Sequence, residues 1–191
     1  MDLFEKAKTV RLRTITDKFL VAEDDEETVF QSREDYSKNS IWKVERIRGR
    51  YVRFKSCHGT YLTASAQLFV PGIIGKKVVH QSIPETADDV WIDWEPVRDG
   101  FQVRLRSRSG SFLRPNGGLP PWRNTVTHDM PHTSKTHEKV LWNIDVVEAL
   151  PTPHRRSCSD FTKAPAPHVD DHKTAASHPP HKKLTTLEDL W

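Results

Sequence analysis

The stretch with the clearest capacity for ligand chemistry is the loop at residues 116–124, which reads Asn-Gly-Gly-Leu-Pro-Pro-Trp-Arg-Asn. Two glycines let a ligand approach the backbone closely, two prolines stiffen the loop, and Trp beside Arg and Asn suits stacking on a sugar ring. We therefore predict a ligand-binding site here. Its candidate residues are Gly117, Gly118, Trp122, Arg123, Asn124, His128 and Asp129. The alternative is that Trp122 only covers one end of a barrel.

The polar residues after this loop suggest metal binding or catalysis, and the sequence favours neither. His128, Asp129, His132 and His137 have a helical spacing, but Pro131 opposes a helix and no Cys accompanies them. We find no nucleophile elbow, phosphate loop, pair of catalytic carboxylates or metalloprotease signature. The sequence thus predicts a protein that is not an enzyme and holds no metal or other cofactor.

A second set of candidate residues is basic and alternates with apolar residues in three stretches. It consists of Arg11, Arg13, Arg53, Lys55, Arg104 and Arg106. Alternation in a strand places the apolar side chains inside and the basic ones outside, where they could meet an acidic protein or a phosphate. The alternative is that they pair with acidic neighbours such as Glu45, Asp93 and Asp145.

The same stretches reveal the elements that must position these residues. Residues 10–20, 52–62 and 103–113 each alternate for four positions, turn at a small or polar centre, and resume with an aromatic residue followed by Leu. The turn centres are Asp17, Gly59 and Gly110, residue types that tolerate a left-handed backbone. The pattern predicts one β-hairpin written three times.

Each copy continues with a Val and then a Trp. The Val anchors are Val29, Val78 and Val126, and the Trp anchors are Trp42, Trp94 and Trp142. The spacing is fixed inside each hairpin and varies afterwards, as expected when the variation lies in loops. Three copies of about four short strands predict an all-β protein, a single β-trefoil of three pseudo-symmetric four-stranded repeats.

Two shorter stretches carry further predictions. Residues 2–8 could form a short helix, capped by Asp2, that turns Leu3, Phe4 and Ala7 towards the barrel. The acidic run at 23–27 invites a calcium site, but it lacks the spaced ligands and central Gly of an EF-hand loop. A solvated turn is the preferred interpretation.

Composition divides the chain into a β-trefoil domain at 1–149 and a Pro- and His-rich tail at 150–191, which we predict to be disordered. The segment 184–191, with its leucines and Trp, either folds onto a partner or is an unselected end. The net charge of +3 favours no nucleic acid partner. Two cysteines, Cys57 and Cys158, make no disulfide framework, and we find no signal peptide or membrane span, so we predict a cytoplasmic location.

Three stretches resemble a known family. Residues 4–13, 18–29 and 117–129, the last beginning Gly-Gly-Leu-Pro-Pro-Trp-Arg-Asn, are similar to a plant family of domains of uncharacterised function that is related to fascin-like, actin-cross-linking β-trefoils. The resemblance covers residues 1–149 and implies a cytosolic plant protein with a trefoil fold. It implies no known ligand.

Two functions follow as hypotheses. The first is a non-enzymatic interaction module that binds a protein partner, with actin filaments suggested by the resemblance. The second is a carbohydrate or small-ligand binder that uses the loop from Gly117 to Asn124. Neither hypothesis fixes an oligomeric state.

Overall fold

A computed structural model describes residues 2–34, 38–47, 49–69, 77–86, 89–131 and 138–151 of the 191-residue chain. The predicted tail lies outside these residues from position 152 onward, together with Cys158 and the segment 184–191. His132 and His137 also lie outside them. The compact unit that contains the described residues extends from Met1 to Pro153.

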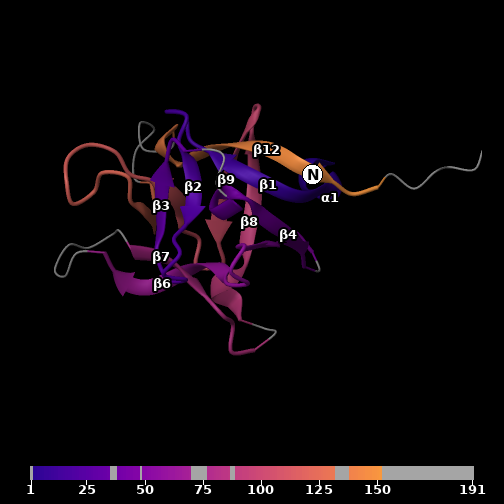
Figure 1. Ribbon diagram of the computed structural model, residues 1–191, viewed down its shortest axis with the longest axis horizontal. Coiled ribbons are helices and arrows are strands. Elements are labelled where there is room, and N and C mark those ends of the chain that lie inside the picture. Colours follow the sequence, from indigo (N-terminus) through magenta and orange to yellow (C-terminus); the bar gives the residue numbers. More distant parts are fainter. Residues whose placement is uncertain are drawn as a thin grey trace, which may run out of the picture. The chain divides into compact units, whose positions relative to one another are not determined.

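The strands form one antiparallel sheet of twelve members that closes around a core (Figure 1). They are β1 (Ala7–Arg13), β2 (Phe19–Ala22), β3 (Val29–Ser32), β4 (Trp42–Arg46), β5 (Val52–Lys55), β6 (Tyr61–Leu68), β7 (Lys77–Ser82), β8 (Trp94–Asp99), β9 (Gln102–Ser107), β10 (Phe112–Pro115), β11 (Val126–Asp129) and β12 (Leu141–Ala149). The short helices are α1 (Asp2–Lys6) and the 3-10 turns η1 (Lys38–Ser40), η2 (Val90–Ile92) and η3 (Glu138–Val140). The protein is therefore all-β with a barrel-like core.

Three hairpins form where the sequence predicts them: β1–β2, β5–β6 and β9–β10, called here the first, second and third hairpin. Each is closed by the same backbone hydrogen bond of 2.8 Å, from the N–H of the first residue to the carbonyl of the second in the pairs Thr14 and Lys18, Ser56 and Thr60, and Ser107 and Ser111. The turn centres Asp17, Gly59 and Gly110 have φ of 56°, 89° and 88°. Their left-handed backbone confirms the interpretation of these positions as turn centres.

The three predicted Trp anchors are fully buried and make the same contact. Trp42, Trp94 and Trp142 are each 0% exposed. Their indole N–H groups donate at 3.0, 2.9 and 3.1 Å to the carbonyls of Leu20, Leu62 and Leu113, the second residues of β2, β6 and β10. A 3-10 turn ends two residues before each Trp. These hydrogen bonds define corresponding positions along the chain.

The Val anchors are confirmed in two places and corrected in the third. Val29 lies opposite Ala22, and Val126 lies opposite Pro115. In β7 the residue with this role is Val79, which lies opposite Ala64 and is 3% exposed, whereas the predicted Val78 pairs with Thr127 of β11. A shift of one residue exchanges the two faces of a strand, so choosing between two adjacent valines decides which one enters the core.

Three buried polar side chains join neighbouring parts of the sheet. Gln31, Gln81 and His128 lie opposite Leu20, Leu62 and Leu113, so they occupy corresponding positions in β3, β7 and β11. Gln31 Nε2 donates to the carbonyls of Asn116 and Thr125 at 2.9 and 2.7 Å, and Gln81 Nε2 donates to those of Glu23 and Thr28 at 3.1 and 2.9 Å. His128 Nε2 donates to the carbonyl of Ser65 at 2.7 Å. Each of these three side chains, called clamps here, therefore forms hydrogen bonds to a different part of the sheet.

The helix α1 is shorter than predicted. It ends at Lys6, because Ala7 already begins β1 and pairs with Ala149 of β12. Phe4 is nevertheless buried as predicted, with its ring edge against Phe54 at a centroid distance of 5.9 Å. The helix thus packs on the barrel through this ring.

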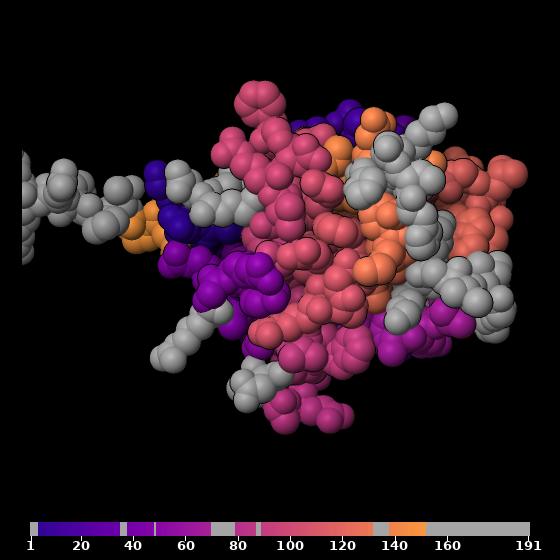
Figure 2. Space-filling view, turned by 180° about the vertical axis from the view of Figure 1, so that it is seen from behind, coloured from indigo at the N-terminus to yellow at the C-terminus, as the bar shows by residue number. Residues whose placement is uncertain are grey.

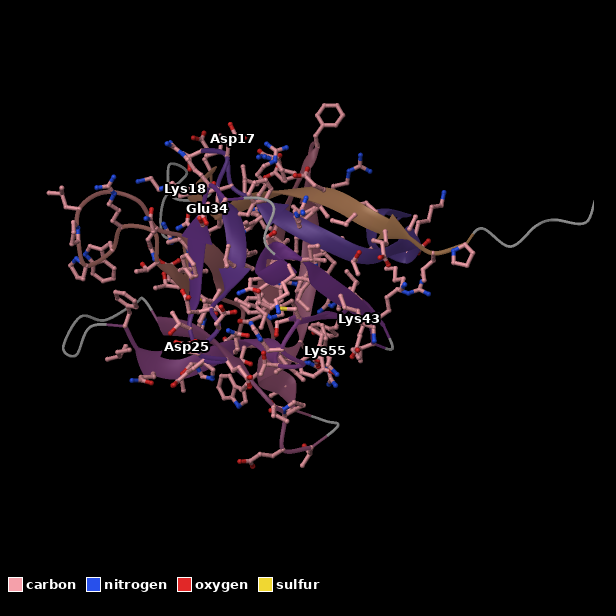
Figure 3. All side chains as sticks on the ribbon, viewed as in Figure 1. Asp17, Lys18, Asp25, Glu34, Lys43 and Lys55 are labelled. Atoms are coloured by element: carbon pink, nitrogen blue, oxygen red, sulfur yellow. The ribbon has the colours of Figure 1, made fainter. Side chains whose placement is uncertain are left out.

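The acidic run forms an exposed turn between β2 and β3 (Figure 3). The Asp25 carboxylate accepts hydrogen bonds from the N–H groups of Glu27 and Thr28 and from the Thr28 hydroxyl. The hydrogen bonds from Thr28 and Glu27 lower the pKa of Asp25. The carboxylate is thus occupied in shaping the turn, as the preferred interpretation predicts.

The connection between β8 and β9 projects from the surface (Figure 2). It turns at Gly100, whose φ is 60°, and its next residue, Phe101, is completely exposed.

None of the helices in the described ranges is both long and apolar enough to cross a membrane.

Candidate functional site

The loop between β10 and β11 is a compact structure held by its own backbone. The Asn116 N–H donates to the Thr125 carbonyl at 2.9 Å, and the Thr125 N–H donates to the Trp122 carbonyl at 3.1 Å. Gly118 has φ of 86°, a value that a side chain would strain. The two glycines therefore lie on a fixed loop that begins and ends beside the barrel.

The base of this loop is anchored by buried amides. Asn116 is 5% exposed, and its Nδ2 donates to the Thr127 hydroxyl at 2.9 Å. The Gln31 side chain of β3 holds the carbonyls on both sides of the loop, those of Asn116 and Thr125. These hydrogen bonds tie both sides of the loop to β3.

The first hairpin reaches the same loop from the other side. Lys18 Nζ donates to Asn124 Oδ1 at 2.7 Å, across more than half of the chain in sequence. Asn124 has φ of 65°, a conformation that Asn tolerates better than most residues. The predicted site residue Asn124 thus positions a lysine, a partner that the sequence did not reveal.

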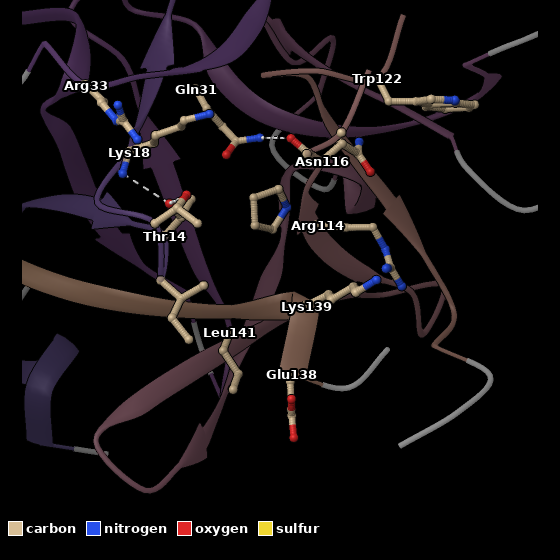
Figure 4. Close-up of a pocket in the computed structure, with 15 residues that line it drawn as sticks. Thr14, Lys18, Gln31, Arg33, Arg114, Asn116, Trp122, Glu138, Lys139 and Leu141 are labelled. Carbon is tan, nitrogen blue, oxygen red and sulfur yellow. Dashed lines mark hydrogen bonds between the residues drawn. The ribbon is translucent and has the colours of Figure 1, made fainter. Parts of the chain in front are cut away.

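An open pocket of about 630 Å³ lies between these elements (Figure 4). It is lined by the turn of the first hairpin, the end of β3, the β10–β11 loop and η3. The lining residues are Thr14, Ile15, Thr16, Lys18, Gln31, Arg33, Arg114, Pro115, Asn116, Gly117, Gly118, Trp122, Glu138, Lys139 and Leu141. Of the predicted site residues, Gly117, Gly118 and Trp122 therefore line one pocket.

The lining is rich in positive charge. The described lining residues include four cations, Lys18, Arg33, Arg114 and Lys139, and one carboxylate, Glu138. In Figure 4 the Glu138 side chain points away from the other labelled side chains. Arg114 is neutralised from outside the pocket, because its Nε donates to Asp129 Oδ1 at 2.7 Å. The other three cations, Lys18, Arg33 and Lys139, form no ion pair with an acidic side chain in the described part of the chain.

Trp122 differs from the presented aromatic that the sequence suggests. Its indole stacks on Phe69 with a centroid distance of 4.9 Å and an interplanar angle of 29°. In Figure 4 it extends from the rim away from the other labelled side chains. The ring is only half-buried, so it anchors the loop and edges the pocket.

The four other predicted site residues, Arg123, Asn124, His128 and Asp129, do not line the pocket. His128 is 0% exposed, with Nε2 on the Ser65 carbonyl and Nδ1 2.6 Å from the Ser111 hydroxyl, so both of its ring nitrogens are engaged within the fold. It shares a strand face with Val126, which already points into the core. Asp129 forms the ion pair with Arg114, and Arg123 is exposed on the loop outside the lining.

Most of the basic side chains pair with carboxylates, as the alternative interpretation has it. The pairs are Arg13 with Asp145 at 2.8 Å, Arg53 with Asp93 at 2.6 Å, Arg104 with Asp99 at 3.4 Å and Arg106 with Glu95 at 2.5 Å. Arg11 Nε donates to the Ser40 hydroxyl at 3.2 Å. Lys55 lies across from Lys43 and 5.2 Å from the Tyr61 ring centroid (Figure 3). The expected basic ladders are therefore largely neutralised by their neighbours.

Sequence reasoning missed the cations Lys18, Arg33 and Lys139. They come from three separate segments, and no local motif marks them. Only the tertiary structure brings them to one pocket. Within the described part of the chain, no group of three or more His, Cys, Asp or Glu side chains is arranged to hold a metal ion.

Comparison with known families decides the classification. Residues 1–142 match the model described as "Beta-trefoil domain of unknown function (DUF569)". The chain belongs to the DUF569 family. This assignment confirms the predicted β-trefoil. The comparison with curated proteins gives no match to this DUF569 chain.

Solved structures show the same fold at low identity. The Haemophilus ducreyi cytolethal distending toxin is 18% identical, with a TM-score of 0.57 over 76% of the DUF569 chain and 88% of its own. The designed 3-fold symmetric protein ThreeFoil is 17% identical, with a TM-score of 0.57 over 72% and 98%. The GlcNAcα1-4Gal releasing endo-β-galactosidase from Clostridium perfringens is 20% identical, with a TM-score of 0.54 over 73% and 32%. At these identities the likeness concerns the fold alone.

Proposed function

We propose that this DUF569 protein is a non-enzymatic binding module, built on a three-repeat trefoil, that holds a small hydroxylated ligand such as a carbohydrate. The observation that carries the proposal is the open pocket of about 630 Å³ beside Gly117 and Gly118. Pockets for small molecules typically measure about 300 to 1,000 Å³. The loop that the sequence predicts as a binding site is one wall of this pocket.

The polar groups around the pocket suit binding better than catalysis. Its described lining contains no His or Cys, and the Thr14 hydroxyl already accepts the Lys18 N–H at 3.1 Å. A nucleophile would need a base within hydrogen-bonding reach, and Glu138 points away from the other labelled side chains (Figure 4). Binding requires only the donors and charges that are present.

A bulky side chain at Gly117 tests the proposal. A Cβ at this position would meet no atom within 4 Å, and the backbone there needs no left-handed conformation, so Gly117→Leu should fill pocket space without disturbing the fold. Gln67→Leu places the same apolar side chain at an exposed position of β6 outside the pocket lining and serves as the control. Both variants should keep the thermal midpoint of the parent protein.

The assay is a titration of ¹⁵N-labelled protein with a panel of neutral, phosphorylated and sulfated glycans. We expect Gly117→Leu to weaken binding by about tenfold or more, since filling a pocket removes at least one good contact, and Gln67→Leu to leave it unchanged. If both variants bind the panel as the parent does, the site lies elsewhere.

A protein partner is the second candidate function, and one observation favours it. Phe101 is fully exposed at the projecting turn between β8 and β9, as aromatic contact residues often are (Figure 2). The family resemblance suggests actin filaments and a cytoplasmic plant protein. Co-sedimentation with filamentous actin that is lost in Phe101→Ser would support this candidate, and no co-sedimentation at low salt would remove it.

A further inference from the structure

Three cations surround the pocket without a carboxylate partner. Lys18 comes from the first hairpin, Arg33 follows β3, and Lys139 is the middle residue of η3. Across the ranges that the structure describes, none of the three forms an ion pair with an Asp or Glu side chain. Acidic side chains do not offset their positive charge, so this charge is available to an anionic ligand.

The position of Lys18 carries no charge in the other two hairpins. The hydrogen bond that closes each hairpin ends at Lys18 in the first, at Thr60 in the second and at Ser111 in the third. Thr60 bonds Gln81 and Ser111 bonds His128, whereas Lys18 extends to Asn124. The second and third hairpins thus form with a hydroxyl side chain at this position, so the hairpin does not require a lysine there.

The same contrast holds for Lys139. It is the middle residue of η3, and the middle residues of η1 and η2 are Asn39 and Trp91. The three 3-10 turns stand at the same distance before Trp42, Trp94 and Trp142. A lysine is therefore not needed to form this turn.

Arg33 completes the pattern. Arg33 follows Ser32, which pairs with Phe19, the first residue of β2. The corresponding partners of the first residues of β6 and β10 are Ser82 and Asp129. The residues that follow these two are Ile83 and Met130. At all three positions, charge is present beside this pocket and neutral side chains occupy the other two places. The fold does not require the cations, so their presence points to a ligand.

We propose that the ligand of this pocket carries a phosphate or sulfate ester on its hydroxylated ring, and that Lys18, Arg33 and Lys139 bind this ester. The proposal rests on the proposed function. An Arg fork and two ammonium groups match the several oxygens of such an ester, and charge-assisted hydrogen bonds are the strong ones. The bond from Lys18 Nζ to Asn124 Oδ1 fixes one cation in place before the ligand arrives.

The test measures affinity for pairs of glycans. Each phosphorylated or sulfated mono- or oligosaccharide is titrated beside its unmodified parent by isothermal calorimetry. The ester should bind about tenfold tighter or more than the parent sugar, and its affinity should fall as the salt concentration rises. Comparing phosphate with sulfate on the same sugar shows which ester the site prefers.

Paired charge variants locate the effect. Arg33→Gln with Lys139→Gln changes two exposed residues of the pocket, and Lys38→Gln with Arg46→Gln removes the same charge at exposed positions elsewhere. The pocket pair should lose about a hundredfold for the ester, about tenfold for each cation, and keep the affinity for the parent sugar. The control pair should keep both affinities.

The failures are distinguishable. If the parent sugar binds as tightly as the ester and the pocket pair changes neither affinity, the ester is wrong, while a weakening by Gly117→Leu still supports the proposed function. If no member of the panel binds, both proposals are wrong.

Discussion

Replacing His128 by alanine should remove one of the three side chains that clamp neighbouring parts of the sheet. Because the Ser65 carbonyl can only accept, Nε2 carries the proton in the neutral ring, and Nδ1 accepts from the Ser111 hydroxyl. His128→Ala leaves the partly buried Ser65 carbonyl without its donor, which costs about 1–3 kcal/mol of folding stability. The cavity left by the ring adds about 1–2 kcal/mol. We expect a total loss of about 3 kcal/mol.

The informative variant is His128→Gln. Glutamine occupies the corresponding positions at Gln31 and Gln81, and Gln81 makes both types of bond, donating to carbonyls through Nε2 and accepting from Thr60 through Oε1. A glutamine at 128 can therefore donate to Ser65 and accept from Ser111. The expected loss is below about 1 kcal/mol, as for an exchange that keeps the hydrogen bonds and nearly the volume.

Urea unfolding followed by tryptophan fluorescence measures both variants. With a slope of about 2 kcal/mol/M, His128→Ala should lower the midpoint by about 1.5 M and His128→Gln by less than about 0.5 M. Both variants should bind ligands as the parent does, because His128 does not line the pocket. Equal losses for Gln and Ala would refute the correspondence of the three clamps.

Three further predictions concern stability. Burial lowers the pKa of His80, so the unfolded chain takes up a proton at a higher pH than the folded protein does. The free energy of unfolding should therefore fall as the pH drops below about 6.5. In urea unfolding at a series of pH values, His80→Thr should show a smaller drop of the midpoint than the parent protein. Asp93→Asn leaves the nearly buried Arg53 and its neighbour Arg108 without their shared carboxylate. Thermal unfolding should show that the protein loses about 3–5 kcal/mol of stability. A loss below about 1 kcal/mol would contradict the account of Arg53 and Asp93 as a buried ion pair. A chain ending at Pro153 should unfold at the same temperature as the full chain, whereas a clear drop would show that later residues stabilise the domain.

The hairpins could be predicted because their signals are local. Alternation, a turn centre and an aromatic residue lie within one short stretch, and Asp17, Gly59 and Gly110 adopt the backbone that their types allow. The three buried Trp residues follow from the same repeated pattern. The error at Val78 arose because two adjacent valines give no local sign of which one faces the core.

The candidate site could be predicted only in part. The glycines of the loop pointed to it, but its cations lie far apart in sequence, and only the pairing of strands brings Lys18 to Asn124. The burial of His128 could have been predicted, because its alternation with Val126 places it on the inner face of β11. The stacking of Trp122 on Phe69 had no sequence signal.

Mapping of amide chemical shifts tests the central claim most directly. A phosphorylated or sulfated glycan that binds in the calorimetric panel is added to ¹⁵N-labelled full-length protein. We predict that the shifts concentrate in residues 14–18, 31–33, 115–118 and 138–141, the segments that line the pocket. Shifts centred instead on the separate pocket beside Arg46, Arg50 and Tyr51 would contradict the account.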